Sequence, residues 1–323
     1  MISLKNKTIY VAGHNGMVGS SVLRKLREIK VKKIIYRSRK QLDLSDFRKT
    51  EIFIKKHKPD VIINCAGKVG GIMFNVDNPA DILEVNALIQ INLIKAAFNN
   101  NTPYFIYLGS SCIYPKYSKQ PIKEDYLLSN KPEPTNEGYA LSKILGLKSC
   151  EYYNKQYGKN FVTLMPCNLY GPNDNFDLRN SHFIPAFINK YVEAYEKKKS
   201  HIEVWGTGKA KREIMHVDDL SSAILFVLDK IIKKDKKILK IIKDKGFLNV
   251  GTGKDYTIKQ YAKIMGRHFD KKIDIKYNKK YPEGMKRKLL DISLISKLGW
   301  KPKISMDKGF KNTISWYIKN KNL

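Results

Sequence analysis

Three side chains of the sequence have the types and spacing that proton transfer beside a carbonyl group requires. Tyr139 and Lys143 stand at positions i and i+4 of "YALSK", so a helix places them on one face. Because an isolated tyrosine hydroxyl titrates at about pH 10, a neighbouring ammonium would have to stabilise its phenolate for proton exchange at neutral pH. Ser110, at the end of an earlier apolar run, could donate a hydrogen bond to an oxygen whose charge changes during the reaction.

The stretch around Ser110, "GSSCIYP" at residues 109–115, puts two hydroxyls and a thiol together where an apolar run ends. Serines are common in turns, so this segment alone is compatible with a purely structural role. The thiol of Cys112 could likewise be a small buried apolar side chain. Since "YxxxK" is also frequent by chance, the interpretation depends on what else converges on these residues.

A glycine-rich loop near the N-terminus indicates a dinucleotide site. The apolar run 8–13 leads directly into "GHNGMVGS", and a helical pattern follows. Glycines in such a loop let backbone N–H groups approach a pyrophosphate, which the positive end of the following helix also attracts. The GxxGxxG spacing is a close relative of the dinucleotide fingerprint, and we expect the cofactor to bind at Gly13, Asn15, Gly16, Met17 and Gly19.

The end of the second predicted strand favours NADP(H) over NAD(H). An acidic residue at this place would accept hydrogen bonds from a ribose 2′-hydroxyl, whereas arginine suits a 2′-phosphate. The segment "YRSRK" offers Arg37 and Arg39, although on so basic a chain both could be ordinary surface cations. Asp43 and Leu44 follow where the edge of an adenine could be held, and Asp43 could equally begin a turn.

Short apolar runs alternate with segments of helical length through the first half of the chain. The runs lie at residues 8–13, 33–37, 61–67, 104–110 and 161–166, and the helical segments include 17–29, 80–99 and 139–157. This alternation predicts an α/β fold with a doubly wound parallel sheet of the Rossmann type. Ligands of such sheets bind beyond the carboxyl ends of the strands, where the glycine loop and Ser110 lie.

After Pro166 the pattern loosens into "CNLYGPNDNFDLRNSH", which predicts a long loop or the start of a second lobe. We expect residues 1–166 to form the dinucleotide-binding domain, with 217–251 returning to it as a helix and a strand. Residues 167–216 and 252–323 would form a smaller C-terminal substrate-binding lobe that ends in a helix over 305–320. The basic and apolar segment 230–245 is typical of a helix that runs into a loop insertion.

Composition limits the class of protein. The chain has 61 Lys and Arg against 30 Asp and Glu, a formal net charge of +31, but the lysines are scattered. We therefore expect a solvated surface that favours an anionic small molecule, and no nucleic-acid partner. The four cysteines form no CxxC pair and have no histidine-rich neighbourhood, which argues against a disulfide framework or a metal site. Without a long apolar run, we also expect no membrane partner and a cytoplasmic location.

A series of motifs along nearly the whole chain carries a family resemblance. In order they are "GHNGMVGS", "KVGGI", "GSSCIYPK", "EPTNEGYALSK", "MPCNLYGPNDNF", "NSHFIPA", "REIMHVDD", "NVGTG" and "RKLLD". With them the chain resembles the GDP-L-fucose synthases, a family of extended short-chain dehydrogenases/reductases. The resemblance implies a homodimeric enzyme that inverts two ring carbons of a GDP-4-keto-6-deoxy sugar and then reduces its C4 ketone with NADPH.

The resemblance also implies roles for particular residues. Ser110, Tyr139 and Lys143 would serve the reduction, Lys143 also touching the cofactor, while Cys112 and His182 would be the base and acid of ring inversion. The remaining matches, at places that hold the nucleotide and its diphosphate in the family, are Asn168, Trp205, Arg212 and Lys288. Trp205 could instead only hold the smaller lobe in place.

Two departures from the family pattern affect these expectations. Asn15 stands where the family often has Arg, which removes one contact to a 2′-phosphate and weakens the preference for NADP(H). Gly138 stands where the family often has Pro, which could loosen the start of the helix that carries Tyr139. Two alternatives therefore stay open: a GDP-4-keto-sugar reductase without epimerase activity, for example on a GDP-heptose, and a non-catalytic NADP(H) sensor.

Overall fold

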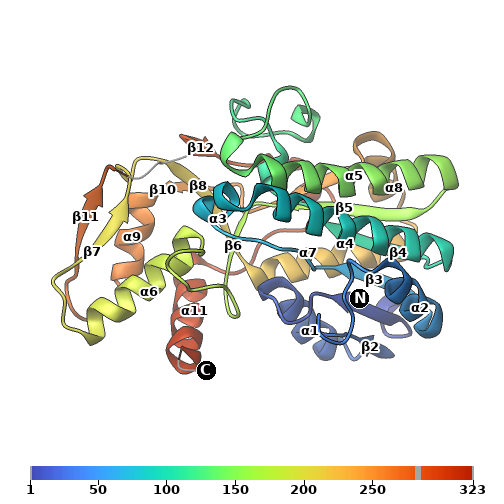
Figure 1. Cartoon of the computed structure of the whole chain (residues 1–323), viewed down its shortest axis with the longest axis horizontal. Helices are drawn as coiled ribbons and strands as arrows, with labels where there is room; N and C mark the ends of the chain where they lie inside the picture. The colour runs from blue at the N-terminus through green and yellow to red at the C-terminus, as the bar shows by residue number, and fades with distance from the viewer. Residues whose placement is uncertain (1, 281–284, 322–323) are drawn as a thin grey trace.

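The computed structural model describes residues 2–280 and 285–321, and its larger part is a six-stranded parallel sheet (Figure 1). The strands lie in the order β2-β1-β3-β4-β5-β9. Their bounds are β1 Thr8–Ala12, β2 Lys33–Ile35, β3 Val61–Asn64, β4 Tyr104–Leu108, β5 Asn160–Pro166 and β9 Phe247–Val250. All five neighbouring pairs are parallel, which confirms the predicted doubly wound α/β fold.

The order of the strands reverses at β1, because the chain goes from β1 to β2 on one side and then crosses to β3 on the other. Such a reversal opens a crevice at the carboxyl ends of β1 and β3, where doubly wound sheets bind their ligands. The central strands β1, β3 and β4 are almost completely buried, which is why each appears in the sequence as a continuous apolar run rather than an alternating one. The glycine loop and Ser110 follow β1 and β4 at this crevice edge.

Helices cover the sheet in pairs. Helix α1 packs against α7, while α4 packs against both α2 and α5, and the long parallel course of α4 and α5 is plain in Figure 1. Their bounds are α1 Met17–Ile29, α2 Phe47–His57, α4 Pro79–Asn99, α5 Glu137–Tyr157 and α7 Val217–Ile232. Helix α5 ends at Gly158, whose φ of 61° is the left-handed conformation that closes a helix and favours glycine. This end sets the length of the helix that carries Tyr139 and Lys143.

A smaller region with mixed strand directions lies beyond the sheet. Strand β8 (Lys211–His216) pairs with β6 (Asn168–Tyr170) and β12 (Arg287–Lys288) in parallel and with β10 (Asp255–Thr257) in antiparallel, while β7 (His201–Trp205) pairs with β11 (Asp274–Asn278). Helices α6 (Phe183–Glu196), α9 (Ile258–Gly266) and α11 (Met306–Asn320) pack around a second apolar cluster that is separate from the core of the large sheet. The remaining elements are α3 (Ile72–Asp77), α8 (Lys236–Lys245), α10 (Ser293–Lys297) and the 3-10 turns η1 (Ile2–Leu4), η2 (Ser111–Ile113), η3 (Glu124–Tyr126) and η4 (Pro134–Asn136).

The segment 230–245 is helical for most of its length, so the predicted loop insertion is wrong. After α7 ends, Asp235 accepts hydrogen bonds from the backbone N–H groups of Lys237 and Ile238 and thereby begins α8. Gly246, with φ of 77°, ends that helix. The basic residues of this segment therefore extend from a second helix packed against α7 and β9.

Candidate active site

The three residues first singled out meet at the carboxyl end of β4. Ser110 begins the short turn η2, and its hydroxyl accepts a hydrogen bond from the backbone N–H of Cys112 at 3.4 Å. Tyr139 and Lys143 come from the first turns of α5, with the Lys143 ammonium 5.6 Å from the centre of the Tyr139 ring. Lys143 is 5% exposed, and its Nζ donates a 2.9 Å hydrogen bond to the carbonyl of Leu108. All three line one hollow of about 400 Å³.

The charge states of this group follow from burial. Burial raises the pKa of the Tyr139 hydroxyl well above its ordinary value, the neighbouring Cys112 adds to this rise, and a hydrogen bond to Ser110 opposes it. The expectation that Lys143 brings the Tyr139 pKa down towards neutrality is therefore not met in this structure. Burial also lowers the pKa of Lys143 to about 8, while the neighbouring Cys112 and Cys65 partly offset this by raising it. Tyr139 is thus held in its neutral, proton-donating form.

The glycine loop leaves no space for a side chain at Gly13 or Gly19. A Cβ on Gly13 would lie 2.6 Å from the backbone nitrogen of Ala66, just beyond β3, and Gly13 itself has a left-handed φ of 74°. A Cβ on Gly19 would likewise run into the Gly13 backbone. Gly16 and Met17, at the start of α1, line the 400 Å³ hollow, whereas Asn15 is exposed and does not. The loop therefore brings backbone and a helix N-terminus to the crevice, as a pyrophosphate requires.

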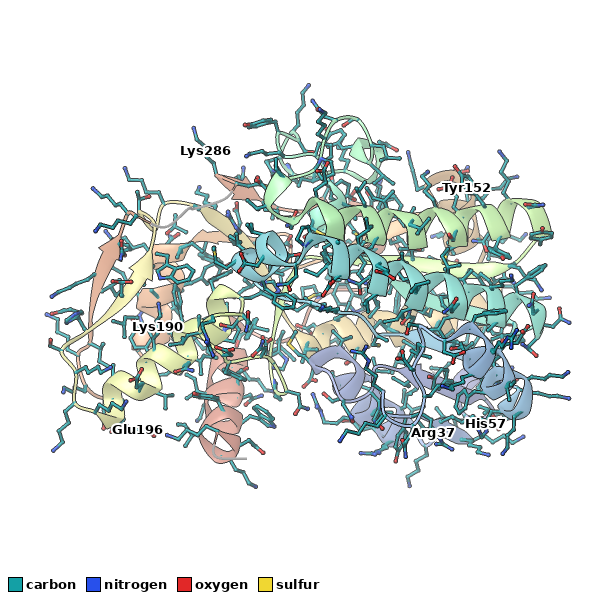
Figure 2. All side chains as sticks on the ribbon, in the orientation of Figure 1. Arg37, His57, Tyr152, Lys190, Glu196 and Lys286 are labelled. Atoms are coloured by element: carbon teal, nitrogen blue, oxygen red, sulfur yellow. The ribbon has the colours of Figure 1, made fainter. Side chains whose placement is uncertain are left out.

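The residues expected around the adenine and 2′-phosphate are only partly brought together. The Arg37 guanidinium lies over the Phe53 ring of α2, 5.6 Å from its centre, and donates to the Tyr36 carbonyl at 2.8 Å. Figure 2 shows Arg37 beside His57, whose ring contacts Phe53 at a tilt of 53°. The role of Arg37 at a 2′-phosphate stays a prediction. Arg39 is exposed and has no such ring contact among the described residues.

Asp43 begins a turn, one of the two roles that the sequence left open, and the Leu44 side chain is buried. The Asp43 carboxylate accepts hydrogen bonds from the backbone N–H of Ser45 at 3.0 Å and from its hydroxyl at 2.7 Å, so it begins a turn. These two bonds lower the pKa of Asp43. The Leu44 side chain packs in the core of the large sheet, and the contact of this segment with an adenine edge stays a prediction.

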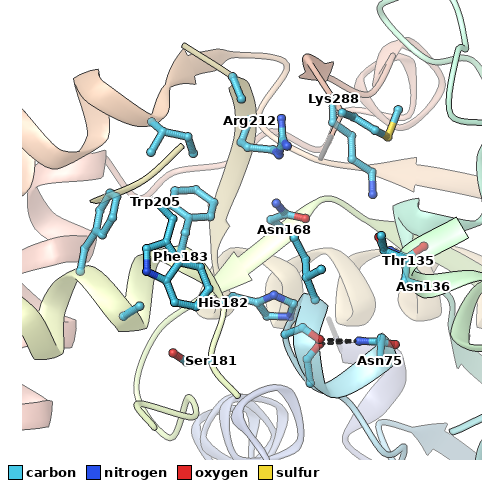
Figure 3. A pocket seen from close by; sticks show the side chains of 18 of the residues that line it. Asn75, Thr135, Asn136, Asn168, Ser181, His182, Phe183, Trp205, Arg212 and Lys288 are labelled. Atoms are coloured by element: carbon cyan, nitrogen blue, oxygen red, sulfur yellow. Dashed lines mark hydrogen bonds between the residues drawn. The ribbon is translucent and has the colours of Figure 1, made fainter. Parts of the chain in front are cut away.

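A second hollow, of about 280 Å³, adjoins the first on the side of the smaller region (Figure 3). The residues that line both hollows are Gly70, Asn75, Cys112, Asn136, Asn168, Ser181, His182 and Lys288. The two hollows are therefore two halves of one cleft. Cys112 and His182, predicted as the base and the acid, lie where the halves meet. Tyr139 and Lys143 belong to the first half, and Trp205 and Arg212 to the second.

Two cations form one wall of the second half. Arg212 on β8 and Lys288 on β12 are direct partners in the register of these parallel strands, and Figure 3 shows both side chains reaching the cavity. Burial lowers the pKa of Lys288, and the charge of Arg212 lowers it further. Trp205 closes the far end with 40% of its surface exposed and with the Lys190 ammonium 5.6 Å from its ring centre. An aromatic face and paired cations suit a nucleotide base and a diphosphate.

The acid and base candidates are both uncharged near neutral pH. Burial raises the pKa of the Cys112 thiol, while the Lys288 ammonium, a hydrogen bond to Ser110 and Lys143 oppose the rise. His182 caps the start of α6 and faces the open cleft, yet the surrounding protein and the charge of Lys288 lower its pKa. Lys288 thus acts on both residues, in the direction that favours a thiolate and a neutral imidazole.

Some cleft residues were not singled out from the sequence. Glu133, 8% exposed, lines the second half and pairs with Lys116 at 3.2 Å, and Asn75 shapes the cleft floor through hydrogen bonds to the carbonyls of Gly70 and Gly71. Both occur within or near the quoted motifs. Lys190 lies seven residues after Phe183 on α6, so the two residues share one face of the helix. This spacing is the feature of the sequence from which Lys190 could have been predicted as a cleft residue.

Within residues 2–280 and 285–321, no three His, Cys, Asp or Glu side chains group closely enough to hold a metal ion. None of the helices in these ranges combines the length and the apolar character needed to cross a membrane.

Comparison with known proteins agrees with this geometry. The chain is 39% identical over 323 residues to the GDP-L-fucose synthase of Escherichia coli, covering 99% of each chain, and 41% identical to the GDP-L-colitose synthase of Yersinia pseudotuberculosis, covering 97% of this chain and 99% of that protein. Among solved structures, a GDP-mannoheptose C4 reductase from Campylobacter jejuni with NADP bound is 34% identical, with a TM-score of 0.87 over 97% of this chain and 99% of that chain.

A family model described as "NAD dependent epimerase/dehydratase family" matches residues 9–241. This match spans the glycine loop, the Ser110 turn, the Tyr139 helix and the cations of β8. The chain therefore belongs to the NAD-dependent epimerase/dehydratase family of extended short-chain dehydrogenases/reductases, as an enzyme similar over its full length to GDP-L-fucose synthases.

Proposed function

We propose that the protein reduces the C4 ketone of a GDP-4-keto-6-deoxy sugar with NADPH, after inverting C3 and C5, and so forms GDP-L-fucose. One observation carries the proposal. The half-cleft that holds Ser110, Tyr139 and Lys143 and the half-cleft that holds Trp205 and Arg212 meet at Cys112 and His182. A sugar that extends from a diphosphate held by Arg212 would bring its ring between these two groups and its ketone towards Tyr139.

The residues present fit a nicotinamide dinucleotide. The tight turn that Gly13 and Gly19 allow brings Gly16, Met17 and the N-terminus of α1 to the hollow, which suits a pyrophosphate, and Arg39 suits a 2′-phosphate. The Lys143 ammonium, at the opposite end of the same hollow, would bind the nicotinamide ribose. When bound, the cofactor supplies the hydride for the ketone carbon. NADP is named in the Campylobacter jejuni structure, which supports NADP(H) over NAD(H) here.

The proton for the reduced oxygen comes from Tyr139. As the ketone carbon gains hydride, its oxygen becomes an alkoxide that a neutral phenol can protonate. The raised pKa of Tyr139 keeps that proton in place until the oxygen is basic enough to take it. Ser110 donates a second hydrogen bond to the same oxygen, and the Lys143 ammonium stabilises the phenolate that is left.

Ring inversion uses the other two groups. A proton on a carbon beside a ketone is acidic because the resulting enolate spreads its charge onto oxygen. Cys112 removes such a proton as thiolate and becomes a thiol, while His182, in its imidazolium form, gives a proton to the carbon and becomes a neutral imidazole. The Lys288 ammonium, which opposes the burial of the Cys112 thiol, raises the thiolate fraction at a given pH.

A C4 reductase without epimerase activity is the second candidate. Solved structures with 32% and 34% identity to this chain are named as a GDP-6-OMe-4-keto-L-xylo-heptose reductase and a GDP-mannoheptose C4 reductase, both from Campylobacter jejuni. Such an enzyme needs Ser110, Tyr139 and Lys143 but has no use for a base at Cys112. The burial of the Cys112 thiol and its raised pKa are compatible with this alternative.

Incubation in D₂O separates the two. The purified protein is given GDP-4-keto-6-deoxymannose without NADPH, and deuterium at C3 and C5 is followed by mass spectrometry and NMR. The epimerase-reductase incorporates deuterium at both positions and, once NADPH is added, releases GDP-L-fucose. A reductase alone leaves both carbons unlabelled, and a panel of GDP-4-keto heptoses with NADPH and NADH then identifies its substrate. No NADPH oxidation with any member of the panel would contradict both readings.

Assembly and domain division extend the proposal. Helices α4 and α5 lie side by side and expose apolar side chains, namely Leu83, Leu88, Leu141, Leu145 and Tyr152. Apolar side chains gathered on neighbouring helices suit a homodimer interface. We also propose the division into a cofactor domain of residues 1–166 with 217–251 and a GDP-sugar lobe of 167–216 with 252–323. The second apolar cluster lies within the lobe's ranges, while Leu290, Ile295 and Trp300 of those ranges pack in the core of the large sheet. A cytoplasmic location stays a prediction.

A further inference from the structure

Glu213, a residue outside the cleft, has the features of a positioning residue for the diphosphate site. It follows Arg212 on β8 and is 2% exposed. Its Oε1 accepts hydrogen bonds from the backbone N–H groups of Thr252 at 2.6 Å and Gly253 at 2.7 Å, and its Oε2 accepts one from Leu290 at 2.9 Å. One carboxylate therefore binds the backbone of two segments that are distant in sequence from β8 and from each other.

The segment that contains Leu290 depends on this bond for its place. Strand β12 has two residues, Arg287 and Lys288, so its pairing with β8 supplies few ladder hydrogen bonds. Two residues after Lys288, the backbone N–H of Leu290 finds the Glu213 side chain instead of another strand. Glu213 thus extends the attachment of the Lys288 segment to β8 beyond the end of the strand.

The turn that supplies the other two donors is shaped around the carboxylate. A Cβ on Gly251 would collide with Glu213 Oε1, and Gly253 has a left-handed φ of 69°. Both positions therefore favour glycine, the first for space and the second for conformation. Burial raises the pKa of Glu213 to about 7 in spite of the three backbone donors, so a carboxylate at this place is costly to keep.

Glu213 holds together the cationic wall of the cleft, which consists of Arg212 and Lys288. Neighbouring residues of a strand point to opposite faces, so Glu213 lies behind the sheet while Arg212 faces the cleft. Arg212 and Lys288 are direct partners across β8 and β12, and their like charges repel. Attachment of Leu290 to Glu213 keeps the two strands together against that repulsion.

The flanking residues have other attachments, so loss of the Glu213 bond need not unfold the segment. The N–H of Leu289 donates to Gln120 Oε1 at 2.8 Å, and the N–H of Asp291 donates to the Ile122 carbonyl at 2.8 Å. These bonds attach the Lys288 segment to the loop that follows Cys112, on the side opposite to β8. Towards β8, the N–H of Lys211 donates to the Lys286 carbonyl at 2.8 Å ahead of the two-residue ladder, and Glu213 supplies the attachment that follows the ladder.

We propose that Glu213 is a positioning residue which sets the separation of Arg212 and Lys288 for the diphosphate of a nucleotide sugar. The inference rests on the proposed function, since it takes GDP as the ligand of this wall. Glu213 touches neither substrate nor cofactor and acts through the two cations on the far side of β8.

The test is Glu213→Gln in the full-length protein, with GDP and NADPH as separate probes. The glutamine carbonyl can still accept from Thr252 and Gly253, but its NH₂ meets the Leu290 N–H, donor against donor. We expect GDP affinity measured by calorimetry to fall about tenfold or more, as an unpaired buried donor implies, with NADPH affinity unchanged within about twofold. In steady-state assays, KM for the GDP-sugar should rise while kcat stays close to that of the unmodified protein.

Glu124→Gln is the matched control. Glu124 is also a buried carboxylate that accepts from a backbone N–H, that of Asn249 at 2.9 Å, but it has no bond to the Lys288 segment. This variant should retain GDP affinity within about twofold if position beside Arg212 is what matters. Equal loss of GDP affinity in both variants, or loss of GDP and NADPH affinity together in Glu213→Gln, would overturn the positioning role. So would unchanged GDP binding in Glu213→Gln. If the unmodified protein binds NADPH but not GDP, the proposed function fails, and this inference fails with it.

Discussion

The ammonium of Lys143 donates a 2.9 Å hydrogen bond to the carbonyl of Leu108, the last residue of β4. This bond joins the helix that carries Tyr139 to the strand that leads into Ser110. This bond, together with the packing of α5 on β4 and η2, keeps the three reactive groups close to one another. Because the same ammonium is buried, its charge is lost at a pH well below the ordinary value for lysine.

Reduction should weaken in mildly alkaline solution. Burial lowers the Lys143 pKa to about 8, so the ammonium is present below that pH and is lost as the pH rises through it. We expect kcat/KM for NADPH-dependent reduction to fall along an alkaline limb centred at about pH 8. Lys143→Met should lower kcat/KM by about 100-fold or more and abolish that limb. A profile that stays flat up to pH 10 would show that the Lys143 charge is not required.

Tyr139→Phe should separate the two half-reactions. Removal of the hydroxyl deletes the proton donor for the alkoxide, so kcat for reduction should fall by about 10²–10⁴-fold. Deuterium exchange at C3 and C5 should continue, because Cys112 and His182 are intact. Loss of exchange together with reduction in this variant, with NADPH affinity unchanged, would mean that Tyr139 itself takes part in ring inversion.

Exchange of the ring protons should increase with pH. Burial raises the pKa of the Cys112 thiol, so the thiolate is scarce at neutral pH and grows as the pH rises. Measured without NADPH, deuterium incorporation should rise from pH 6 to pH 9 and should vanish in Cys112→Ser. Lys288→Met removes the cation that most opposes this shift, and its exchange profile should move to higher pH. Exchange that persists in Cys112→Ser would assign the base elsewhere.

Arg39 and Arg37 should differ in their effect on cofactor choice. The Arg37 guanidinium contacts the Phe53 ring and donates a hydrogen bond to the Tyr36 carbonyl, whereas Arg39, exposed near the end of β2, has no such ring contact among the described residues. We expect Arg39→Ala to raise KM for NADPH about tenfold with little effect on NADH, as loss of one phosphate contact implies. Arg37→Ala is the matched control and should change neither value by more than about twofold. The reverse pattern would show that Arg37 turns when the cofactor binds.

Asn249 should matter for stability rather than for chemistry. Its fully buried amide accepts from the Tyr114 hydroxyl at 2.5 Å and donates to the carbonyls of Ile122 and Asp291. Asn249→Ala leaves a buried hydroxyl and two carbonyls without these partners, and we expect the free energy of unfolding to fall by about 2–4 kcal/mol. Urea denaturation measures this change. Asn100→Ala, at the exposed end of α4, should cost less than about 1 kcal/mol.

Much of the large sheet was predictable because its strands carry their own signal. Strands buried on both faces must be apolar throughout, so β1, β3, β4 and β5 stand out as continuous runs. The glycine loop and the Tyr139–Lys143 pair were predictable for a similar reason, since their spacing is local. These signals need no knowledge of distant parts of the chain.

The rest of the cleft depends on contacts between distant segments. The two-residue strand β12 exists because β8 pairs with it, and nothing in "RKLLD" alone indicates a strand. The contact of Arg37 with Phe53 on α2 and the burial of Leu44 in the core likewise depend on segments that are distant in sequence, so neither was visible in the local pattern. Glu213 has no local signal either, since all of its donors come from residues that follow it by about 40 or more positions.

Ser110 and Cys112 belong to one short turn, in which the Ser110 hydroxyl accepts a 3.4 Å hydrogen bond from the backbone N–H of Cys112. Under the proposed function, a sugar ring engaged by one is within reach of the other, so both conversions would proceed during a single residence on the protein. A single substitution at position 112 would then remove the base for ring inversion without moving the hydroxyl that assists reduction, and one scaffold would give sugar products that differ in stereochemistry.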